Sequence, residues 1–178
     1  MAFAYDHYVT FEDYEDTAEN RRDELLLRAL VLDEEQVKEY GSWLQYLPEE
    51  ERDDLDPASI EPDCARRSSM AAQNVVTDSR GISAEIWMDA KNLLFFSVPY
   101  DQGFTAKVNG EEVPVLKVSG GMIAVPVEEG HNAVRLEYHT PGLKLALSVA
   151  GVSLLLYGVY LAVSFKGRCK RREEPIKE

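Results

Sequence analysis

The sequence from Leu143 to Phe165 reads LKLALSVAGVSLLLYGVYLAVSF, and Lys144 is its only charged residue. As an α-helix, the uncharged residues after Lys144 would span roughly 31 Å, close to the hydrocarbon thickness of a bilayer. A buried helix of a soluble core is the alternative, but such a helix normally carries a polar stripe, whereas this one has only scattered Ser and Tyr hydroxyls. The stretch therefore predicts one transmembrane helix, with membrane lipid around it.

The charges on the two sides of this helix differ sharply. Directly after the helix comes KGRCKRR, the start of a basic tail over residues 166–178. Of the formal net charge of −13, the tail carries +3 and Lys144 carries +1, which leaves −17 for residues 1–142. Basic segments beside a membrane helix are usually retained in the cytoplasm. The expected location is therefore the cell membrane, single-pass, with an acidic ectodomain outside and the C-terminal tail in the cytoplasm.

The negative charge of residues 1–142 also limits the partners of this part. It would repel nucleic acid and anionic headgroups, so no nucleic-acid binding is expected. Cys64 and Cys169 would lie on opposite sides of the membrane and could not pair. The first residues, MAFAYDHYVTFEDYED, have no basic n-region or apolar h-region of a signal peptide. Two explanations stay open: the chain is the C-terminal piece of a larger multi-pass protein, or the acidic domain remains cytoplasmic as a tail-anchored protein.

Residues 1–47 are interpreted as a mainly helical, amphipathic segment. Thr10 and Thr17 are candidate N-caps, and apolar residues follow Thr17 at helical spacing. A second helix is expected to begin near Asp33 and to be interrupted at Gly41. Its apolar face would hold Tyr40, Trp43, Leu44 and Leu47. Such an aromatic stripe fits either a sugar-stacking platform or core packing, and core packing is the commoner arrangement.

Residues 48–78 are expected to form an acidic loop and linker. Three prolines and no sustained apolar period occur in PEEERDDLDPASIEPDCARRSS, which is typical of a solvated loop. The cluster of Asp53, Asp54 and Asp56 invites comparison with calcium sites, but the glycine and the terminal Glu of an EF-hand loop are missing. The sequence therefore predicts no metal site here.

Residues 79–140 predict a small antiparallel β-sandwich, the ectodomain of a mainly β (α+β) fold. Apolar and polar residues alternate in GISAEIWMDA, as in a strand with one face on a core. NLLFFSVPY is a continuous apolar run, which suits a central strand covered on both faces. Asn109-Gly110 is the commonest two-residue hairpin signal, and Pro114 indicates an edge strand or a bulge. Turns at 119–121 and at EEGH would complete about six strands.

Several of these motifs together resemble a known family. They are FFSVPYDQGF, KVNGEEV, the glycine pair before MIAVPV, and GHNAVRLEYHTPGLKLALSVAGVSLLLYG. In this order they resemble the C-terminal region of the bacterial YfhO membrane-protein family, over residues 79–165. DHYVTFEDYED and ELLLRALVLDEEQ resemble the preceding segment of that family. Phe104, where Trp is expected, and Ala146, where glycine is usual, depart from the family pattern but keep its apolar character.

The resemblance implies a large multi-pass protein, similar to glycosyltransferases that use polyprenyl-phosphate sugars on the outer face of the membrane. Some family members are linked to glycosylation of cell-wall polymers such as lipoteichoic acid. Their acidic catalytic residues lie in loops between N-terminal transmembrane helices, a region with no counterpart in this sequence. The resemblance therefore assigns no catalytic residue and no cofactor to this chain. It also implies that upstream helices, in a longer or separate protein, would bring the domain outside.

The residues themselves indicate two candidate surfaces rather than a catalytic site. His7, His131 and His139 have no partner at metal-ligand spacing, and no P-loop or G-x-S-x-G motif occurs. Trp87, Tyr100 and Phe104 are the candidate ligand-facing aromatics. Within the apolar helix, one face gathers the small residues Gly151, Gly158 and Ala162. Small residues at this spacing let another helix approach closely, which favours other transmembrane helices as partners.

Three functions are compatible with these patterns. The preferred one is a non-catalytic C-terminal ectodomain and membrane anchor of a YfhO-type protein involved in cell-envelope polymer glycosylation, with cell-envelope polysaccharide as a further candidate partner. The alternative is a stand-alone membrane-tethered carbohydrate- or protein-binding module. Several exposed aromatic side chains on one face of the sandwich would favour it, and Trp87, Tyr100 and Phe104 are the first to examine; burial of all three would remove its main support. A third is an inactive remnant of a truncated gene.

Overall fold

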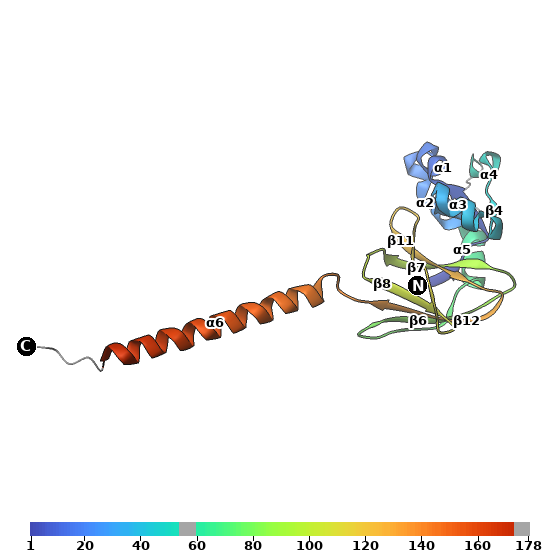
Figure 1. Ribbon diagram of the computed structural model, residues 1–178. Coiled ribbons are helices and arrows are strands. Elements are labelled where there is room, and N and C mark those ends of the chain that lie inside the picture. The colour runs from blue at the N-terminus through green and yellow to red at the C-terminus, as the bar shows by residue number, and fades with distance from the viewer. Residues whose placement is uncertain (54–59, 173–178) are drawn as a thin grey trace, which may run out of the picture. The chain divides into compact units, whose positions relative to one another are not determined.

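The computed structural model describes residues 1–53 and 60–172 (Figure 1). The chain divides into two compact units, Met1–His139 and Thr140–Glu178. The first unit contains a β-sandwich and an N-terminal lobe, and the second contains the long helix α6 (Leu143–Arg172). Asp54 and Asp56 of the acidic cluster and the tail residues 173–178 lie outside the described residues.

The mainly β fold is confirmed, and its centre is a sandwich of two antiparallel sheets. The first sheet has the order β1-β7-β11-β10, and the second has the order β5-β6-β12-β8-β9. The bounds in the first sheet are β1 (Ala2–Ala4), β7 (Asn92–Pro99), β11 (Met122–Val127) and β10 (Leu116–Val118). Those in the second are β5 (Gln73–Thr77), β6 (Gly81–Met88), β12 (Gly130–Tyr138), β8 (Phe104–Val108) and β9 (Glu111–Val113).

The two sheets enclose one hydrophobic core, to which each contributes seven buried side chains. From the first sheet come Ala2, Ala4, Leu94, Phe96, Ile123, Val125 and Val127, and from the second Ala84, Ile86, Met88, Ala106, Val108, Val134 and Leu136. On β6 the alternation is visible directly, because Ile86 and Met88 are buried while Trp87 between them is exposed. Removal of this apolar surface from water is the main stabilisation of the sandwich.

The predicted hairpin at Asn109-Gly110 is confirmed. Both residues have positive φ, 53° and 92°, and they join Val108 of β8 to its register partner Glu111 of β9. This is the backbone of a type I′ turn, whose twist matches that of the flanking strands.

Pro114 marks the point where the chain leaves one sheet for the other. The predicted return strand is split there into β9, an edge of the second sheet, and β10, an edge of the first. Proline has no N–H to give to a ladder, so an edge position is the one it tolerates. The expectation of an edge strand is confirmed, and the crossing closes one side of the sandwich.

Strand β7 is covered on both faces, as its continuous apolar run predicts. Leu94 and Phe96 face the sandwich core, whereas Leu93 and Phe95 face a second hydrophobic cluster shared with the N-terminal lobe. Tyr40, Leu44 and Trp43 belong to this second cluster, and Leu47 belongs to a third cluster inside the lobe. The aromatic stripe is therefore core packing and not a sugar platform.

The N-terminal lobe differs from the predicted helical segment, because it is a mixed α/β structure. Its sheet is parallel, with β2 (His7–Thr10) between β3 (Ala29–Leu32) and β4 (Gln45–Tyr46). Its helices are α1 (Phe11–Asp16), α2 (Arg22–Arg28) and α3 (Glu34–Tyr40), with 3-10 turns at Glu19–Arg21 and Gly41–Trp43. The error has a clear source: Ala29–Leu32 is a short apolar run, and periodicity cannot separate a buried strand from a buried helix at that length.

The caps of the lobe are partly as expected. Thr10 caps α1 and Asp33 caps α3, each in a reciprocal capping box with the residue three positions later. Thr17, however, ends α1 instead of starting a helix, and its N–H donates to the Asp13 carbonyl. The expected interruption at Gly41 is confirmed, since α3 ends at Tyr40.

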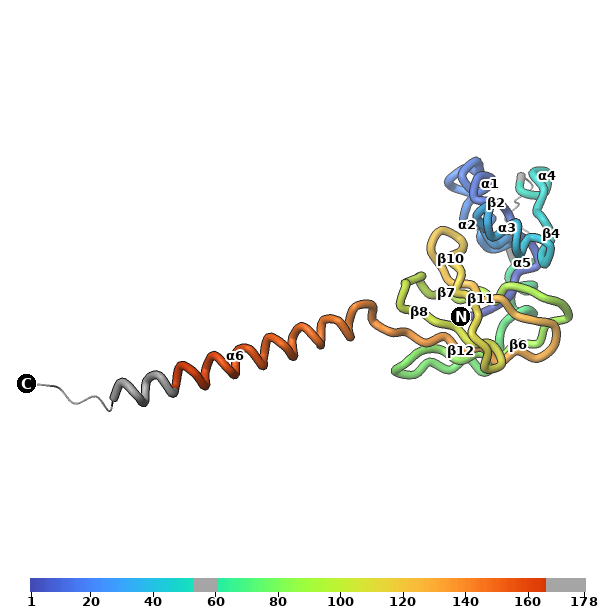
Figure 2. The backbone as a smooth tube through the Cα atoms, in the orientation of Figure 1, coloured from blue at the N-terminus to red at the C-terminus, as the bar shows by residue number. Residues whose placement is uncertain are grey.

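The expected boundaries of the linker and the sandwich also need correction. Residues 48–78 include α4 (Glu49–Asp53), α5 (Ile60–Ser69) and strand β5. The sandwich extends beyond 79–140, because β5 lies beside β6 and β1 lies beside β7. Most of residues 5–72 thus form an insertion between two sandwich strands, the blue and cyan lobe in Figure 2. No local pattern in the sequence reports such a long-range pairing.

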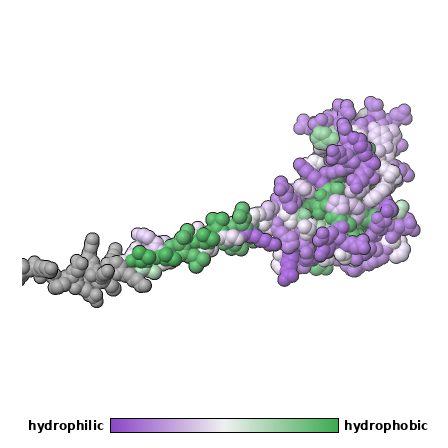
Figure 3. Space-filling model, in the orientation of Figure 1, coloured by the Kyte–Doolittle hydropathy of each residue, from purple (hydrophilic) through white to green (hydrophobic). Residues whose placement is uncertain are grey.

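Helix α6 contains the apolar stretch Leu143–Phe165, which is long and apolar enough to cross a membrane. Its large side chains are exposed along this stretch, for example Leu154 at 71% and Leu155 at 73%. In Figure 3 the helix is almost continuously hydrophobic, while most of the visible surface of the first unit is hydrophilic. An exposed apolar surface of this size is stable in lipid and not in water.

Candidate functional site

The small residues of α6 form one shallow hollow on the helix surface. Gly151, Gly158 and Ala162 line it together with Leu154, Leu155 and Val159. The structure thus brings the three predicted helix-packing residues together on one face. Nothing lies within 4 Å of a Cβ built on Gly151 or Gly158. The surface has the shape that lets a second helix backbone approach.

The three candidate ligand-facing aromatics do not share a face. Trp87 is 70% exposed on the outer face of the second sheet and is paired in register with His131. Phe104 pairs with Tyr138, seven positions further along β12, and its side chain packs against the sandwich core. Tyr100, 36% exposed, lies in the turn before β8. The geometry therefore separates Trp87 from the other two.

A close backbone contact shapes the sandwich end at which Phe104 lies. A Cβ on Gly103 would come within 2.3 Å of the His139 carbonyl oxygen and 2.7 Å of the Tyr138 ring. The His139 N–H donates to the Gly103 carbonyl at 2.8 Å, and the Gly103 N–H donates to Asp101 Oδ1 at 2.8 Å. Only glycine fits between these groups, so the PYDQG turn has a structural role in holding the last residues of β12.

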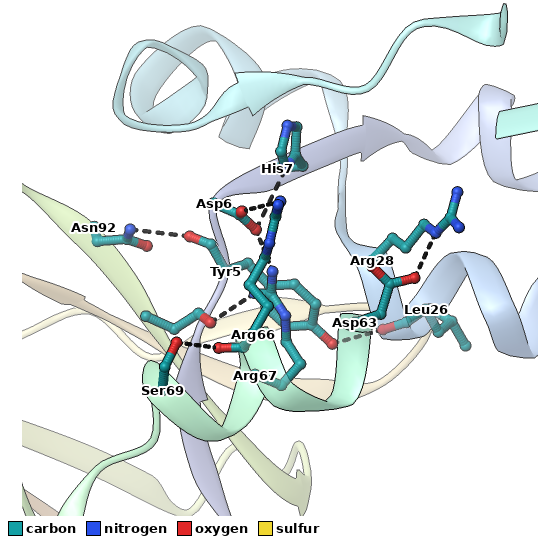
Figure 4. Close-up of polar contacts among 11 residues, drawn as sticks. Tyr5, Asp6, His7, Leu26, Arg28, Asp63, Arg66, Arg67, Ser69 and Asn92 are labelled. Atoms are coloured by element: carbon teal, nitrogen blue, oxygen red, sulfur yellow. Dashed lines mark hydrogen bonds and ion pairs between the residues drawn. The ribbon is translucent and has the colours of Figure 1, made fainter. Parts of the chain in front are cut away.

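A cluster of charged side chains joins α5 to the link between β1 and β2 (Figure 4). Arg67, only 7% exposed, donates to the Ala4 carbonyl at 2.8 Å and to Asp6 Oδ1. Its guanidinium carbon lies 4.7 Å from the centre of the Tyr5 ring. Arg66, 54% exposed, binds the other Asp6 oxygen at 2.8 Å. One carboxylate thus holds two arginines of the same helix.

The charge cluster shifts the ionisation of its members. Partial burial raises the pKa of Asp6, but the hydrogen bond and the positive charge of Arg67 outweigh this effect and lower the pKa to about 2. Burial raises the pKa of Tyr5 to about 12, against the opposing charge of Arg67. The Tyr5 hydroxyl donates to the Leu26 carbonyl at 2.7 Å. Asp6 is therefore anionic and Tyr5 neutral near pH 7, and neither is available as an acid or a base.

A second polar group lies between α1 and α4. Asp13 binds Arg52 at 2.7 Å and accepts a hydrogen bond from the Tyr46 hydroxyl at 3.1 Å. Burial raises the pKa of Asp13, but hydrogen bonds from Thr10 and the charge of Arg52 lower it overall. A pocket beside the pair carries further acidic and basic side chains, among them Glu12 and Arg21. These contacts cap α1 and connect it to α4.

Within the part of the chain that the structure describes, no three His, Cys, Asp or Glu side chains come together as a metal site would require. Cys64 is exposed and forms no disulfide. The α6 face and the exposed aromatic side chains remain the candidate surfaces that the sequence indicates.

The family model described as "Bacterial membrane protein YfhO" matches residues 61–150, about half of the chain. The chain belongs to the YfhO family. The match begins in α5, includes every sandwich strand from β5 to β12 but not β1, and continues into α6. The resemblance drawn from the sequence motifs is confirmed.

One curated relative is the "Uncharacterized protein YfhO" of Bacillus subtilis (strain 168), 29% identical over 68 residues. The matched stretch is 38% of this chain and only 8% of that protein. No solved structure matches the chain. YfhO membership and the apolar helix establish membrane association. Within the matched residues, the segment between Tyr138 and Leu143 connects the sandwich to α6.

Proposed function

We propose that this chain is a non-catalytic ectodomain and membrane anchor of a YfhO-type membrane system that takes part in glycosylation of cell-envelope polymers. The observation that carries the proposal is the YfhO match, which includes the sandwich strands β5 to β12 and the beginning of α6. The role of the sandwich is to brace the catalytic part or to position the acceptor polymer. Sugar transfer itself belongs to other segments of such a system.

The polar groups of the first unit support a non-catalytic role. Arg67, whose side chain is only 7% exposed, and Asp6 bind each other, and Arg67 also donates to the Ala4 carbonyl. An acid or base for glycosyl transfer needs a pKa tuned toward neutral pH and access to substrate. Asp6, with a pKa of about 2, has moved in the opposite direction.

The α6 face supports the expectation of partner helices. A helix that only anchors a domain does not need small residues on one side, whereas close helix packing does. The proposed partner is a multi-pass protein with YfhO-type helices, and Gly158 lies in the centre of the proposed contact.

The test is co-purification with that partner in detergent. The chain is co-expressed with a tagged YfhO-type multi-pass protein, and the amount retained is measured for wild type, Gly158→Ile and Ala146→Ile. Ala146 lies roughly 140° around the helix from Gly151, so it is a matched control outside the small-residue face. We expect Gly158→Ile to reduce retention at least about tenfold, because loss of the close helix contact costs about 1.4 kcal/mol or more of binding free energy. Ala146→Ile should leave retention unchanged.

Activity provides the second arm of the test. The purified chain in vesicles is given a polyprenyl-phosphate sugar, and transfer is followed by loss of the lipid-linked sugar. We expect none. Turnover by the purified chain, or equal retention of all three variants, would contradict the proposal.

A further inference from the structure

The sandwich end at which β12 stops carries three aromatic side chains. Tyr138 is 41% exposed and Tyr100 is 36% exposed. Phe104, half-buried, packs against Tyr138 in a tilted arrangement with 5.0 Å between ring centres. We call this group, Tyr100, Phe104 and Tyr138, the aromatic end. Tyr100 and Phe104 are two of the three aromatics that the sequence indicates as ligand-facing. The third, Trp87, lies at another position of the sheet, so a shared ligand-binding face does not explain the aromatic end.

The chain itself keeps the aromatic end close to the apolar span. Tyr138 is followed after four residues by Leu143, the first residue of α6. Even a fully extended connection between the two residues reaches only about 18 Å. The backbone contact between Gly103 and His139 holds one of these four residues on the sandwich. If α6 crosses a membrane, the aromatic end cannot move far from the headgroup layer.

The chemistry of these side chains suits that layer. Tyrosine combines an apolar ring with a hydroxyl, and it is enriched where hydrocarbon meets water. Loss of hydration and the nearby negative charge of Asp101 raise the pKa of Tyr138, so its hydroxyl stays neutral while its ring is partly exposed. The charge of −17 on residues 1–142 opposes anionic headgroups and favours zwitterionic ones.

We infer that the aromatic end rests in the headgroup layer of the membrane and takes zwitterionic phospholipid as its partner. The inference rests on the proposed anchoring by α6 and adds a second contact, made by the folded sandwich. Its consequence is that lipid contacts the folded sandwich as well as α6.

Trp87 supplies an internal control for the experiment. It is paired with His131, whereas Phe104 is paired with Tyr138. Seven residues of extended strand separate these positions by roughly 23 Å. A tryptophan at position 104 and the native Trp87 therefore report on two ends of the same sheet.

The experiment uses the full chain in vesicles of phosphatidylcholine and phosphatidylethanolamine, with and without bromine-labelled acyl chains. One variant, Trp43→Phe, keeps Trp87 as its only tryptophan. The other combines Trp43→Phe, Trp87→Phe and Phe104→Trp. We expect brominated lipid to quench the fluorescence of the second variant at least about twofold more than that of the first, with emission shifted to the blue.

Equal quenching of the two variants would overturn the inference. If Phe104→Trp disturbs folding, as judged by circular dichroism, Tyr138→Trp replaces it with the same expectation. If the chain does not float with the vesicles, α6 is no membrane anchor, and both the proposed function and the inference are contradicted. Flotation without selective quenching contradicts the inference alone. Replacing half of the lipid by phosphatidylglycerol should weaken the selective quenching, and stronger quenching would rule out the zwitterionic partner.

Discussion

At the scale of single residues, stability in the first unit depends on a few side chains that hold distant segments together. Asp6 and Arg67 are 61 positions apart and connect the link between β1 and β2 to α5. Removing one partner of a buried pair leaves the other charge without compensation, and this costs more than the pair contributes. The two arginines bound to Asp6 differ in burial, which makes a direct comparison possible.

We expect Asp6→Ala to lower the free energy of unfolding by about 3 kcal/mol, because it leaves the guanidinium of Arg67 buried without its anion. Arg66→Ala removes the exposed partner of the same carboxylate and should cost less than about 1 kcal/mol. Chemical unfolding of the detergent-solubilised chain measures both values. Equal costs for the two variants would show that burial of Arg67 does not matter.

The same pair gives a pH dependence. The pKa of Asp6 is lowered from 3.8 to about 2 in the folded chain. Its contribution is therefore complete above about pH 4 and is lost as the pH falls toward 2, since the unfolded state then binds more protons. The difference in unfolding free energy between wild type and Asp6→Asn should shrink across this window. A difference that stays constant between pH 5 and pH 2 would contradict the assignment.

Gly103 is expected to be intolerant of any side chain. In Gly103→Ala the new methyl group would meet the His139 carbonyl oxygen at 2.3 Å, and we expect a loss of about 2–3 kcal/mol from the displaced backbone. Gly120→Ala is the control, because its φ of +74° is strained for alanine but nothing lies within 4 Å of the new Cβ. It should cost about 1 kcal/mol. Thermal unfolding of the two variants ranks them.

At the scale of elements, local chemistry was readable from the sequence and long-range pairing was not. Asn109-Gly110, Pro114 and the caps at Thr10 and Asp33 were predictable, because each depends on the conformational preference of one or two residues. The apolar helix was predictable because its length matches a bilayer and it lacks the polar stripe that a buried core helix normally carries. The candidate site was predictable only for the α6 face, since that face follows from helical periodicity alone.

The missed features have one physical cause in common. Strand Ala29–Leu32, the position of β1 beside β7 and the meeting of Phe104 with Tyr138 are all decided by partners far away in the sequence. Tyr138 could have been noticed as the last residue of a strand just before a membrane helix. Arg67 gave no such signal, because an arginine in an acidic segment is ordinarily solvated.

The position of β1 in the sandwich can be tested by introducing one charged side chain. Ala4 is fully buried in the sandwich core, and Ala4→Glu would place an unpaired carboxylate there. We expect a loss of at least about 4 kcal/mol. Val76→Glu, at a position of β5 that is 58% exposed, should have little effect. If urea unfolding gives Ala4→Glu the same free energy of unfolding as wild type, the pairing of β1 with β7 is contradicted.

At the scale of the whole molecule, charge predicts the orientation in the membrane. The acidic first 142 residues should lie outside and the basic tail in the cytoplasm. Protease added to intact cells is therefore expected to remove the sandwich and to leave a short fragment containing α6. A cytoplasmic protein in the same cells is the control for lysis. Complete protection of the full chain, with digestion only after lysis, would contradict this orientation.

The insertion of the lobe between β1 and β5 has a consequence for how the chain reaches this structure. Ala2 pairs with Phe96, and almost the entire lobe lies between them in the sequence. Closing so long a loop carries an entropic cost before any contact compensates it, so β1 is expected to join β7 late, after β7, β11 and β10 have paired. Until then the apolar β7 has an open edge that could pair with other chains. Production of this protein should therefore depend on dilute conditions or on a chaperone that shields that edge.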